Sequence, residues 1–335
     1  IDEAGNNEWK TLKSVTVNAG KATSVPFLST ERGEWIRVKT DKNTMATVSF
    51  NYTSPDIRST SSDSIYKGLT TVDKTTTTGG LLYGLGDNRR ALGLLANVTV
   101  DGKISETGYY EMGDKLELIR KEDAKTADLI RSKFAIPQQV ISIEESSVLV
   151  VDDLGRRWRL PLGNETYKKL TDQGVLRICR EVATERDLFS CMGTFYELPA
   201  ENADGYAKIR PVSTHNYRIN DYASYRGMLV LTGVTPEDGK ENPHVVISDD
   251  GKAAVWVGVI DDLWTLGKPV GQGGPWKDTD VKTDVASDPY LIAFYDKKEL
   301  SLSHRSDKNV VITVEVDPTG NGDWMEYASY TVKPG

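Results

Sequence analysis

Short segments in which apolar and polar residues alternate recur along the whole chain, and this alternation is typical of strands with one buried face. We expect strands at residues 35–39, 45–50, 95–100, 147–151, 156–160, 228–232, 244–248, 253–259 and 309–316. Asp, Gly and Asn cluster between many of these segments, as in Asp101-Gly102, and such residues close tight hairpins. The pattern therefore predicts antiparallel meanders, with helical periodicity only at residues 122–134 and 165–170.

The two ends of the chain repeat each other. Residues 1–20 align without a gap on residues 316–335, and eight positions are identical. The identical pairs include Gly5 with Gly320, Trp9 with Trp324, Thr16 with Thr331, Val17 with Val332 and Gly20 with Gly335. Self-similarity of this density indicates a chain built from repeated units. It predicts that residues 9–18 and 324–332 take equivalent strand positions in their respective sheets.

The spacing of the Asp-containing turns predicts the architecture. Turn centres near residues 41, 101, 153, 204, 250 and 296 are separated by roughly fifty residues, the length of a four-stranded propeller blade. We therefore expect an all-β chain that forms a single β-propeller domain over residues 1–335. It would have six or seven four-stranded blades, with the ring closed by the two chain ends. Two tandem β-sandwiches are the alternative, but no Pro, Gly or Ser-rich linker marks a boundary.

Composition and charge exclude several classes of partner. The 335 residues carry 41 Lys and Arg against 49 Asp and Glu, a net charge of −8, without a basic run of five. Nucleic acid is therefore not an expected partner. Apolar runs fall far short of the ~20 residues that a membrane-spanning helix needs. The chain opens on Ile1 without Met, as after cleavage of a signal peptide or trimming, and this start distinguishes neither. We expect a secreted or periplasmic protein separately, from the carbohydrate function considered below.

The few cysteines suggest no metal or cofactor. Cys179 and Cys191 could pair across neighbouring strands or remain two buried thiols. No CxxC or Cys/His grouping indicates zinc, and no phosphate-loop pattern occurs. The segment 317–323, DPTGNGD, resembles half of a calcium loop, but Ala328 stands where an EF-hand supplies a bidentate Glu. We therefore expect a turn there and predict neither metal nor cofactor.

Functional side chains are densest between residues 180 and 226. Tyr222 and Tyr225 lie near Arg218 and Arg226 in a stretch with weak strand patterning. Arg offers a bidentate contact to an anion, and Tyr offers a hydroxyl and a stacking face. These four residues predict a pocket that binds hydroxyl groups and a carboxylate or sulfate, and we expect an acid-bearing sugar to bind at Arg218, Arg226 and His215. Structural hydrogen bonds between blades are the alternative interpretation.

His215 is the histidine with the most polar neighbours, and it is a candidate general acid or base. Asp221, six residues further on, is its expected partner, because a carboxylate raises the pKa of an imidazole and fixes its tautomer. Proton transfer by His215 would make turnover depend on pH between about 5 and 8. A purely structural histidine is the alternative.

A second cluster lies between residues 259 and 295. Indoles stack on pyranose faces and carboxylates accept hydroxyl hydrogens, so this cluster is a candidate sugar-binding surface. Tryptophans that fill the core are the alternative. The candidate residues of the cluster are Asp261, Asp262, Trp264, Lys268, Trp276 and Asp288.

The second half of the chain contains TERDLFSCMGTFYELPAENADGYAKIRPVSTHNYRINDYASYRG at residues 184–227 and VWVGVIDDLWTLGKPVGQGGPWKDTDV at residues 255–281. From about residue 175 onward the chain resembles an uncharacterised bacterial β-propeller family of polysaccharide-degrading species. That family is similar in architecture to propeller glycoside hydrolases and polysaccharide lyases. The resemblance implies a site in a central funnel and a plant or algal oligosaccharide or polysaccharide as ligand.

A glycoside hydrolase is the expected function. Its acid and base would come from a pair of carboxylates, and the separation of the pair would predict retention or inversion. A lyase that uses His215, Tyr222 and Arg218 on a uronate is one alternative, and a non-catalytic glycan-binding propeller is the other. The candidate carboxylates are Glu185, Glu197, Asp221, Asp261, Asp262 and Asp288.

Overall fold

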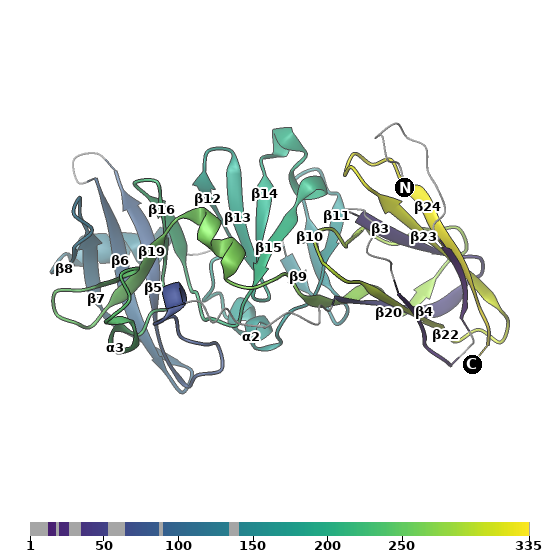
Figure 1. The fold of residues 1–335 in the computed structure, drawn as a ribbon, viewed down its shortest axis with the longest axis horizontal. Coiled ribbons are helices and arrows are strands. Elements are labelled where there is room, and N and C mark those ends of the chain that lie inside the picture. Colours follow the sequence, from purple (N-terminus) through teal and green to yellow (C-terminus); the bar gives the residue numbers. More distant parts are fainter. Residues whose placement is uncertain are drawn as a thin grey trace.

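The computed structural model describes residues 13–17, 20–26, 35–52, 64–86, 90–133 and 141–334. Strands dominate and form one eight-stranded sheet and four four-stranded sheets. Figure 1 shows the sheets following one another along the long axis of the molecule. No helix in this part of the chain has the length and apolar character needed to cross a membrane.

The block at one end of the molecule contains both described chain termini (Figure 1). Its larger sheet runs in the order β1 (Lys13–Val17), β24 (Met325–Val332), β23 (Val310–Asp317), β3 (Trp35–Thr40), β21 (Tyr290–Leu291), β11 (Arg157–Leu160), β10 (Val148–Val151) and β9 (Ile141–Ile143). The smaller sheet runs in the order β2 (Thr23–Pro26), β22 (Glu299–His304), β4 (Thr44–Tyr52) and β20 (Gly271–Val281).

Alternation along β4 explains how the smaller sheet packs. Ala46, Val48 and Phe50 occupy every second position and are buried in a core shared with Val310 and Ile312 of β23. Where β20 crosses β4, a Cβ at Gly274 would lie 1.5 Å from the carbonyl oxygen of Val48, so this close approach requires glycine.

The middle of the molecule is a meander of four antiparallel strands in a stretch where strand patterning is weak, and the sequence predicted none of these strands. The meander contains β12 (Cys179–Ala183), β13 (Arg186–Cys191), β14 (Thr194–Pro199) and β15 (Arg210–Thr214). The short helices around it are α2 (Thr166–Asp172), η3 (Glu201–Ala203), η4 (Gly205–Lys208) and η5 (Ile260–Thr265). The helix predicted at residues 165–170 corresponds to α2.

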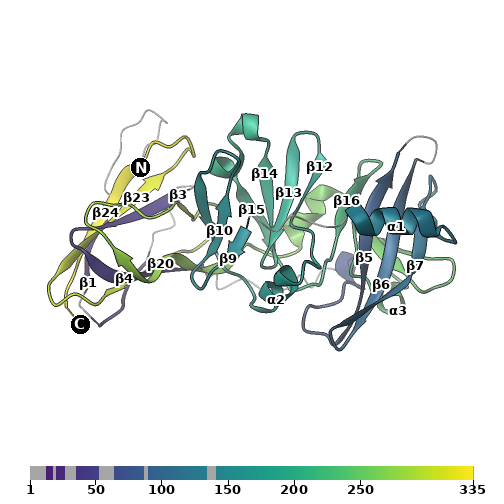
Figure 2. The ribbon, with the colours of Figure 1, turned by 180° about the vertical axis from the view of Figure 1, so that it is seen from behind.

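The opposite end consists of two further four-stranded sheets. One contains β5 (Thr76–Leu85), β6 (Ala91–Val100), β7 (Lys103–Met112) and β8 (Leu118–Lys121); the other contains β16 (Tyr222–Tyr225), β17 (Met228–Leu231), β19 (Ala254–Gly258) and β18 (Val245–Ile247). The helices of this end are η1 (Ser64–Tyr66), α1 (Ala124–Lys133) and α3 (Pro236–Gly239). Figure 2 shows α1, the helix predicted at residues 122–134, lying across β5, β6 and β7.

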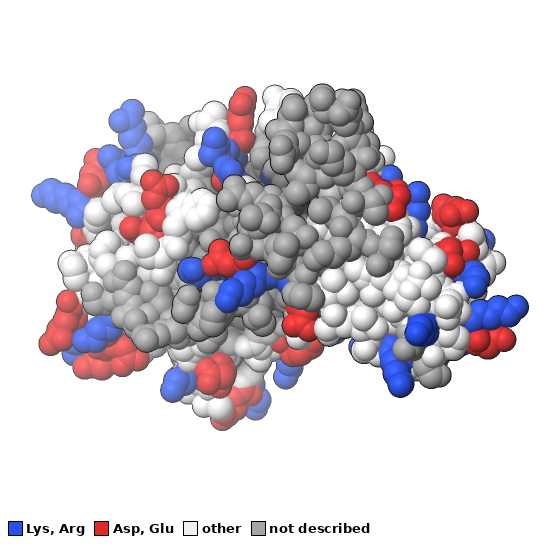
Figure 3. All heavy atoms as spheres, turned by 45° about the vertical axis from the view of Figure 1, so that its right-hand side comes forward, with Lys and Arg blue, Asp and Glu red and all other residues white. Residues whose placement is uncertain are grey.

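The expected fold class is confirmed in part. The chain is all-β, with four-stranded antiparallel sheets, and Asp101 and Gly102 close the β6–β7 hairpin with φ of 48° and 80°. Closure of these sheets into a propeller ring is not found among the described residues and stays a prediction. On the face shown in Figure 3, Lys and Arg side chains are interspersed with Asp and Glu side chains.

The end repeat has a direct structural counterpart. β1 pairs in parallel with β24, from Lys13 beside Ala328 to Val17 beside Val332. This register matches the sequence alignment residue by residue. Residues 13–17 and 328–332 therefore lie beside each other in one sheet and not in equivalent positions of separate sheets, whereas residues 9–12 and 18 lie outside the described residues.

Candidate binding cleft

An open cleft of about 470 Å³ lies where the middle of the chain meets the end block. We name it the tryptophan cleft. The segments that line it are distant in sequence: residues 155–158, two residues of the η3–η4 region, residues 287–289 and the loop that precedes β24. Its polar and aromatic lining residues are Arg156, Arg157, Trp158, Asp204, Asp288, Asn321 and Trp324.

The first wall is held by the Asp152 turn between β10 and β11. One oxygen of the Asp152 carboxylate accepts hydrogen bonds from Trp158 Nε1 at 2.9 Å and from Arg156 Nε at 2.7 Å. The guanidinium of Arg156 lies 5.4 Å from the centroid of the Trp158 ring, within cation–π range. Burial acts to raise the pKa of Asp152, but hydrogen bonds from Trp158 and Arg156 lower it overall. The carboxylate therefore stays ionised and fixes both side chains.

The floor of the cleft is an ion-pair network around Asp288. Asp288 accepts from Arg157 Nε at 3.1 Å and from Arg159 Nε at 2.8 Å. Arg159 also donates to Glu144 at 2.6 Å. The side chain of Asp288 retains 23% of its exposure, so its carboxylate remains within reach of a ligand.

The second wall is the loop between β23 and β24. The carboxylate of Asp317 accepts hydrogen bonds from the backbone N–H groups of Gly320 at 2.8 Å and Gly322 at 2.7 Å, and both glycines have positive φ. Burial raises the pKa of Asp317, against the effect of these hydrogen bonds. The loop is thus a turn closed by its own aspartate. Across the described segments, no three His, Cys, Asp or Glu side chains form a group that could hold a metal ion.

Trp324 follows this turn and completes the wall. The guanidinium of Arg37 lies 4.7 Å from its ring centroid, and Arg37 is ion-paired with Glu315. The cleft thus combines Trp324, a partly exposed indole, and the 8% exposed ring of Trp158 with hydrogen-bond donors and acceptors whose positions are already fixed. Such a lining suits a ligand with apolar faces and many hydroxyl groups, as sugars have.

The structure brings few of the predicted site residues to this cleft. Only Asp288 lines it. Six of the others are buried away from solvent, namely His215, Arg218, Asp221, Tyr222, Tyr225 and Trp276. The remaining predicted residues lie outside the cleft lining, namely Glu185, Glu197, Arg226, Asp261, Asp262, Trp264 and Lys268.

His215 is enclosed and makes structural hydrogen bonds. Its side chain is 4% exposed, and Nδ1 accepts a hydrogen bond from the backbone N–H of Tyr217 at 3.1 Å. The ring packs against Phe195, with centroids 4.9 Å apart. Burial lowers the pKa of His215 to about 3, although the bond from Tyr217 acts to raise it. The imidazole is therefore neutral between pH 5 and 8, which contradicts the predicted titration in that range.

Asp221 pairs with arginines, so the prediction that it partners His215 is wrong. Its carboxylate is completely buried and lies 2.9 Å from Arg177 Nε and 3.4 Å from Arg180 Nη1. It also accepts from the backbone N–H groups of Leu82 and Tyr222, each at 2.8 Å. This carboxylate joins β5, β12 and β16. We call Arg177, Arg180, His215 and Asp221 the buried polar group.

The predicted anion pocket of Arg218, Arg226 and His215 is not assembled. Arg218 is 7% exposed and donates from Nη2 to Thr99 Oγ1 at 3.3 Å. Arg226 lies in the turn after β16, where it pairs with Asp114 and donates to Tyr225 Oη. The hydroxyl of Tyr222 donates inward, to the backbone carbonyl groups of Ile178 and Leu188.

The two predicted tryptophans do not form one surface. Trp276 is 7% exposed and belongs to the core of the end block, whereas Trp264 on η5 is 52% exposed. Asp262 caps η5 by accepting from the backbone N–H of Val259, and Lys268 pairs with Asp296 at 2.7 Å. These positions agree with the alternative interpretation for Trp276.

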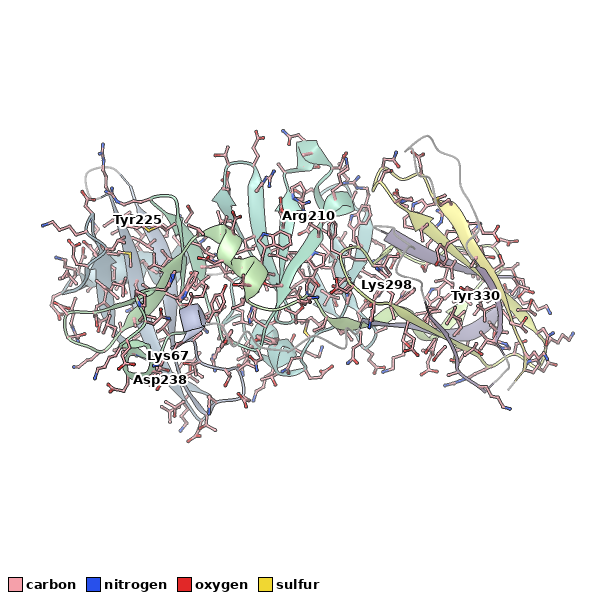
Figure 4. The ribbon with its side chains drawn as sticks, in the orientation of Figure 1. Lys67, Arg210, Tyr225, Asp238, Lys298 and Tyr330 are labelled. Atoms are coloured by element: carbon pink, nitrogen blue, oxygen red, sulfur yellow. The ribbon has the colours of Figure 1, made fainter. Side chains whose placement is uncertain are left out.

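Glu197 and Glu185 lie on the meander. Glu197 bridges Arg186 at 2.7 Å and Arg210 at 2.8 Å. Arg210 and Tyr225, both labelled in Figure 4, lie in different parts of the row of sheets. Glu185 takes a positive φ in the β12–β13 turn. The candidate carboxylates are therefore spread over several sheets.

Both cysteines are free thiols, which decides between the two alternatives left by the sequence. Cys179 Sγ lies 3.5 Å from an oxygen of Asp187. Burial raises the pKa of Cys191 to about 12, so this thiol is protonated and unreactive at neutral pH.

Comparison of the chain with family models, with curated proteins and with solved structures finds no match. The tryptophan cleft was missed in the sequence because its walls come from four separate segments. Two local signals pointed to it, namely the alternating Arg and Trp of residues 156–159 and the Trp324 shared by the end repeat.

Proposed function

We propose that this chain is a carbohydrate-binding protein whose site is the tryptophan cleft. The observation that carries the proposal is the placement of the partly exposed indole of Trp324 in one open cleft with Arg157 and Asp288, next to the nearly buried ring of Trp158. Indole rings cover the apolar face of a pyranose, and ion-paired Arg and Asp side chains still offer hydrogen bonds to hydroxyl groups. A polysaccharide ligand lies outside the cell, which fits a secreted or periplasmic protein. A propeller ring is not required for this site.

The test is a screen of the chain against plant and algal polysaccharides by affinity electrophoresis, followed by calorimetry on the best oligosaccharide. Trp324→Ala should weaken binding about tenfold or more, the equivalent of ~1.4 kcal/mol. Trp264→Ala is the matched control, because Trp264 is an exposed indole outside the cleft. Loss of binding in Trp264→Ala with full binding in Trp324→Ala would overturn the proposal, as would a screen without any bound glycan.

Hydrolysis of the bound glycan is the second candidate function, since two carboxylates, Asp204 and Asp288, line the same cleft. Both are already engaged in ion pairs, Asp204 with Lys208 at 2.6 Å and Asp288 with two arginines. A glycosidase needs one carboxylic acid that gives up a proton, so this arrangement favours binding without cleavage. Release of reducing ends by the wild type, lost in Asp204→Asn and Asp288→Asn, would instead establish hydrolysis.

A further inference from the structure

The two copies of the end repeat contact the same partners in the structure. Along β23, Val310 pairs with both Val17 and Val332, and Val311 pairs with both Thr16 and Thr331. Both copies run antiparallel to β23 in matching registers. In Figure 2, β1 and β24 lie in the same end block, next to β3 and β23.

The side chain of His304, in the facing sheet, lies within hydrogen-bonding distance of both copies of the repeat. Nε2 of His304, on β22, lies 2.7 Å from the carbonyl oxygen of Val17 and 2.9 Å from that of Val332. A neutral imidazole has one N–H and can donate it to one of these oxygens at a time. Val17 and Val332 are both completely buried in the same core.

The edge of a strand offers one row of N–H and C=O groups, which satisfies one neighbouring strand. The larger sheet continues from β23 to β3, with Asp317 paired to Trp35. One row of hydrogen-bonding groups on β23 is thus shared by two strands of nearly the same sequence.

We infer that this edge of β23 is a strand-acceptor site for the repeated sequence, which residues 13–17 and residues 328–332 fill interchangeably. Each chain then carries one acceptor and two donor segments. The donor that is not engaged can pair with the β23 edge of a second copy of the chain whose acceptor is open, which is recognition by strand addition. Backbone hydrogen bonds would supply the affinity, and the buried valine and its Thr neighbour would supply the register.

Two matched substitutions test the two copies of the end repeat one at a time. Val17→Asp places a charge at a buried position of the first copy and Val332→Asp does the same in the second, so each should expel only its own copy. We expect each single variant to keep nearly the melting temperature of the wild type, since the other copy fills the acceptor. The double variant should lose more than the two single losses added together. Additive losses, or a Val332→Asp variant as unstable as the double variant, would overturn the inference.

Mixing experiments test the second copy as partner. The wild type has a spare donor segment and the double variant has an open acceptor, so their mixture should form a 1:1 complex in sedimentation velocity. A Val17→Asp chain has no spare donor and should form no complex with the double variant. Equal binding by the wild type and Val17→Asp, or no binding by either, would overturn donation between chains.

Discussion

The buried polar group and the tryptophan cleft contain the same types of side chain but differ in their access to solvent. In the buried polar group, Asp221 is completely enclosed and its oxygens are taken by two arginines and two backbone N–H groups. In the cleft, Asp288 is also paired with two arginines, but its side chain remains 23% exposed. The first arrangement connects three strands, whereas the second leaves donors and acceptors at an open surface.

This difference shows that a dense run of Arg, Tyr, His and Asp in a sequence does not by itself indicate a site. Ionic groups placed between sheets need the same partners as ionic groups that bind a ligand. A structural ionic group differs from a ligand-binding one in that partners within the protein occupy all of its hydrogen-bonding positions. Substitutions in the buried polar group should therefore change stability, whereas substitutions in the cleft should change binding.

The largest expected effect is that of Asp221→Ala. It removes the completely buried carboxylate that pairs with the largely enclosed guanidinium groups of Arg177 and Arg180, which should lower the free energy of unfolding by about 3–5 kcal/mol. Chemical denaturation measures this loss. Asp204→Asn removes an exposed pair, keeps a residue type that tolerates the positive φ of 73° at this position, and should cost no more than about 1 kcal/mol. Equal losses in the two variants would remove the distinction between a closed and an open region.

The next effect concerns pH. The pKa of His215 is lowered by burial from 6.5 to about 3, so between these values the unfolded state binds more protons than the folded state. The free energy of unfolding therefore falls as the pH decreases through this window and is fully retained above it. His215→Asn keeps an acceptor for the Tyr217 N–H but cannot titrate. Between pH 7 and 4.5 the wild type should lose about 2–3 kcal/mol more than this variant.

The control for this measurement is Phe195→Leu, which alters the packing around the same ring without removing a titratable group. It should lose stability equally at both pH values and keep the slope of the wild type. A slope unchanged in His215→Asn would mean that the pKa of His215 is the same in the folded and the unfolded protein, so that the imidazole titrates in the fold as a catalytic histidine could.

The smallest expected effect is the change in stability caused by substitution of Arg218, compared with substitution of Arg177. Arg218 is desolvated, which lowers its pKa, and its only polar side-chain contact in the described structure is with Thr99. Arg218→Met should therefore change the free energy of unfolding by less than about 1 kcal/mol or increase it. Arg177→Met removes the closest ion-pair partner of the completely buried Asp221 carboxylate, at 2.9 Å, and should be clearly destabilising. Comparison of the two denaturation curves checks this, and a large loss in Arg218→Met would indicate an anionic partner.

The sequence predicted local structure better than it predicted the site. Alternation and Asp-Gly turns located hairpins such as β6–β7, because neighbouring strands pair through short connections. The contact between β11 and β21 rests on one pair, Arg159 with Tyr290, and no local pattern encodes it. The cleft depends on such long-range pairing. For the same reason Asp288 was identified as a candidate while its neighbours Trp158 and Trp324 were not.

The most direct test of the account is hydrogen–deuterium exchange of the chain with and without its bound oligosaccharide. The account predicts slower exchange in residues 155–158, 287–289 and 320–324, the segments that contribute to the lining of the tryptophan cleft, and no change in residues 214–226. Protection confined to residues 214–226, with none in the cleft segments, would contradict it and return the site to the window around His215 and Arg218.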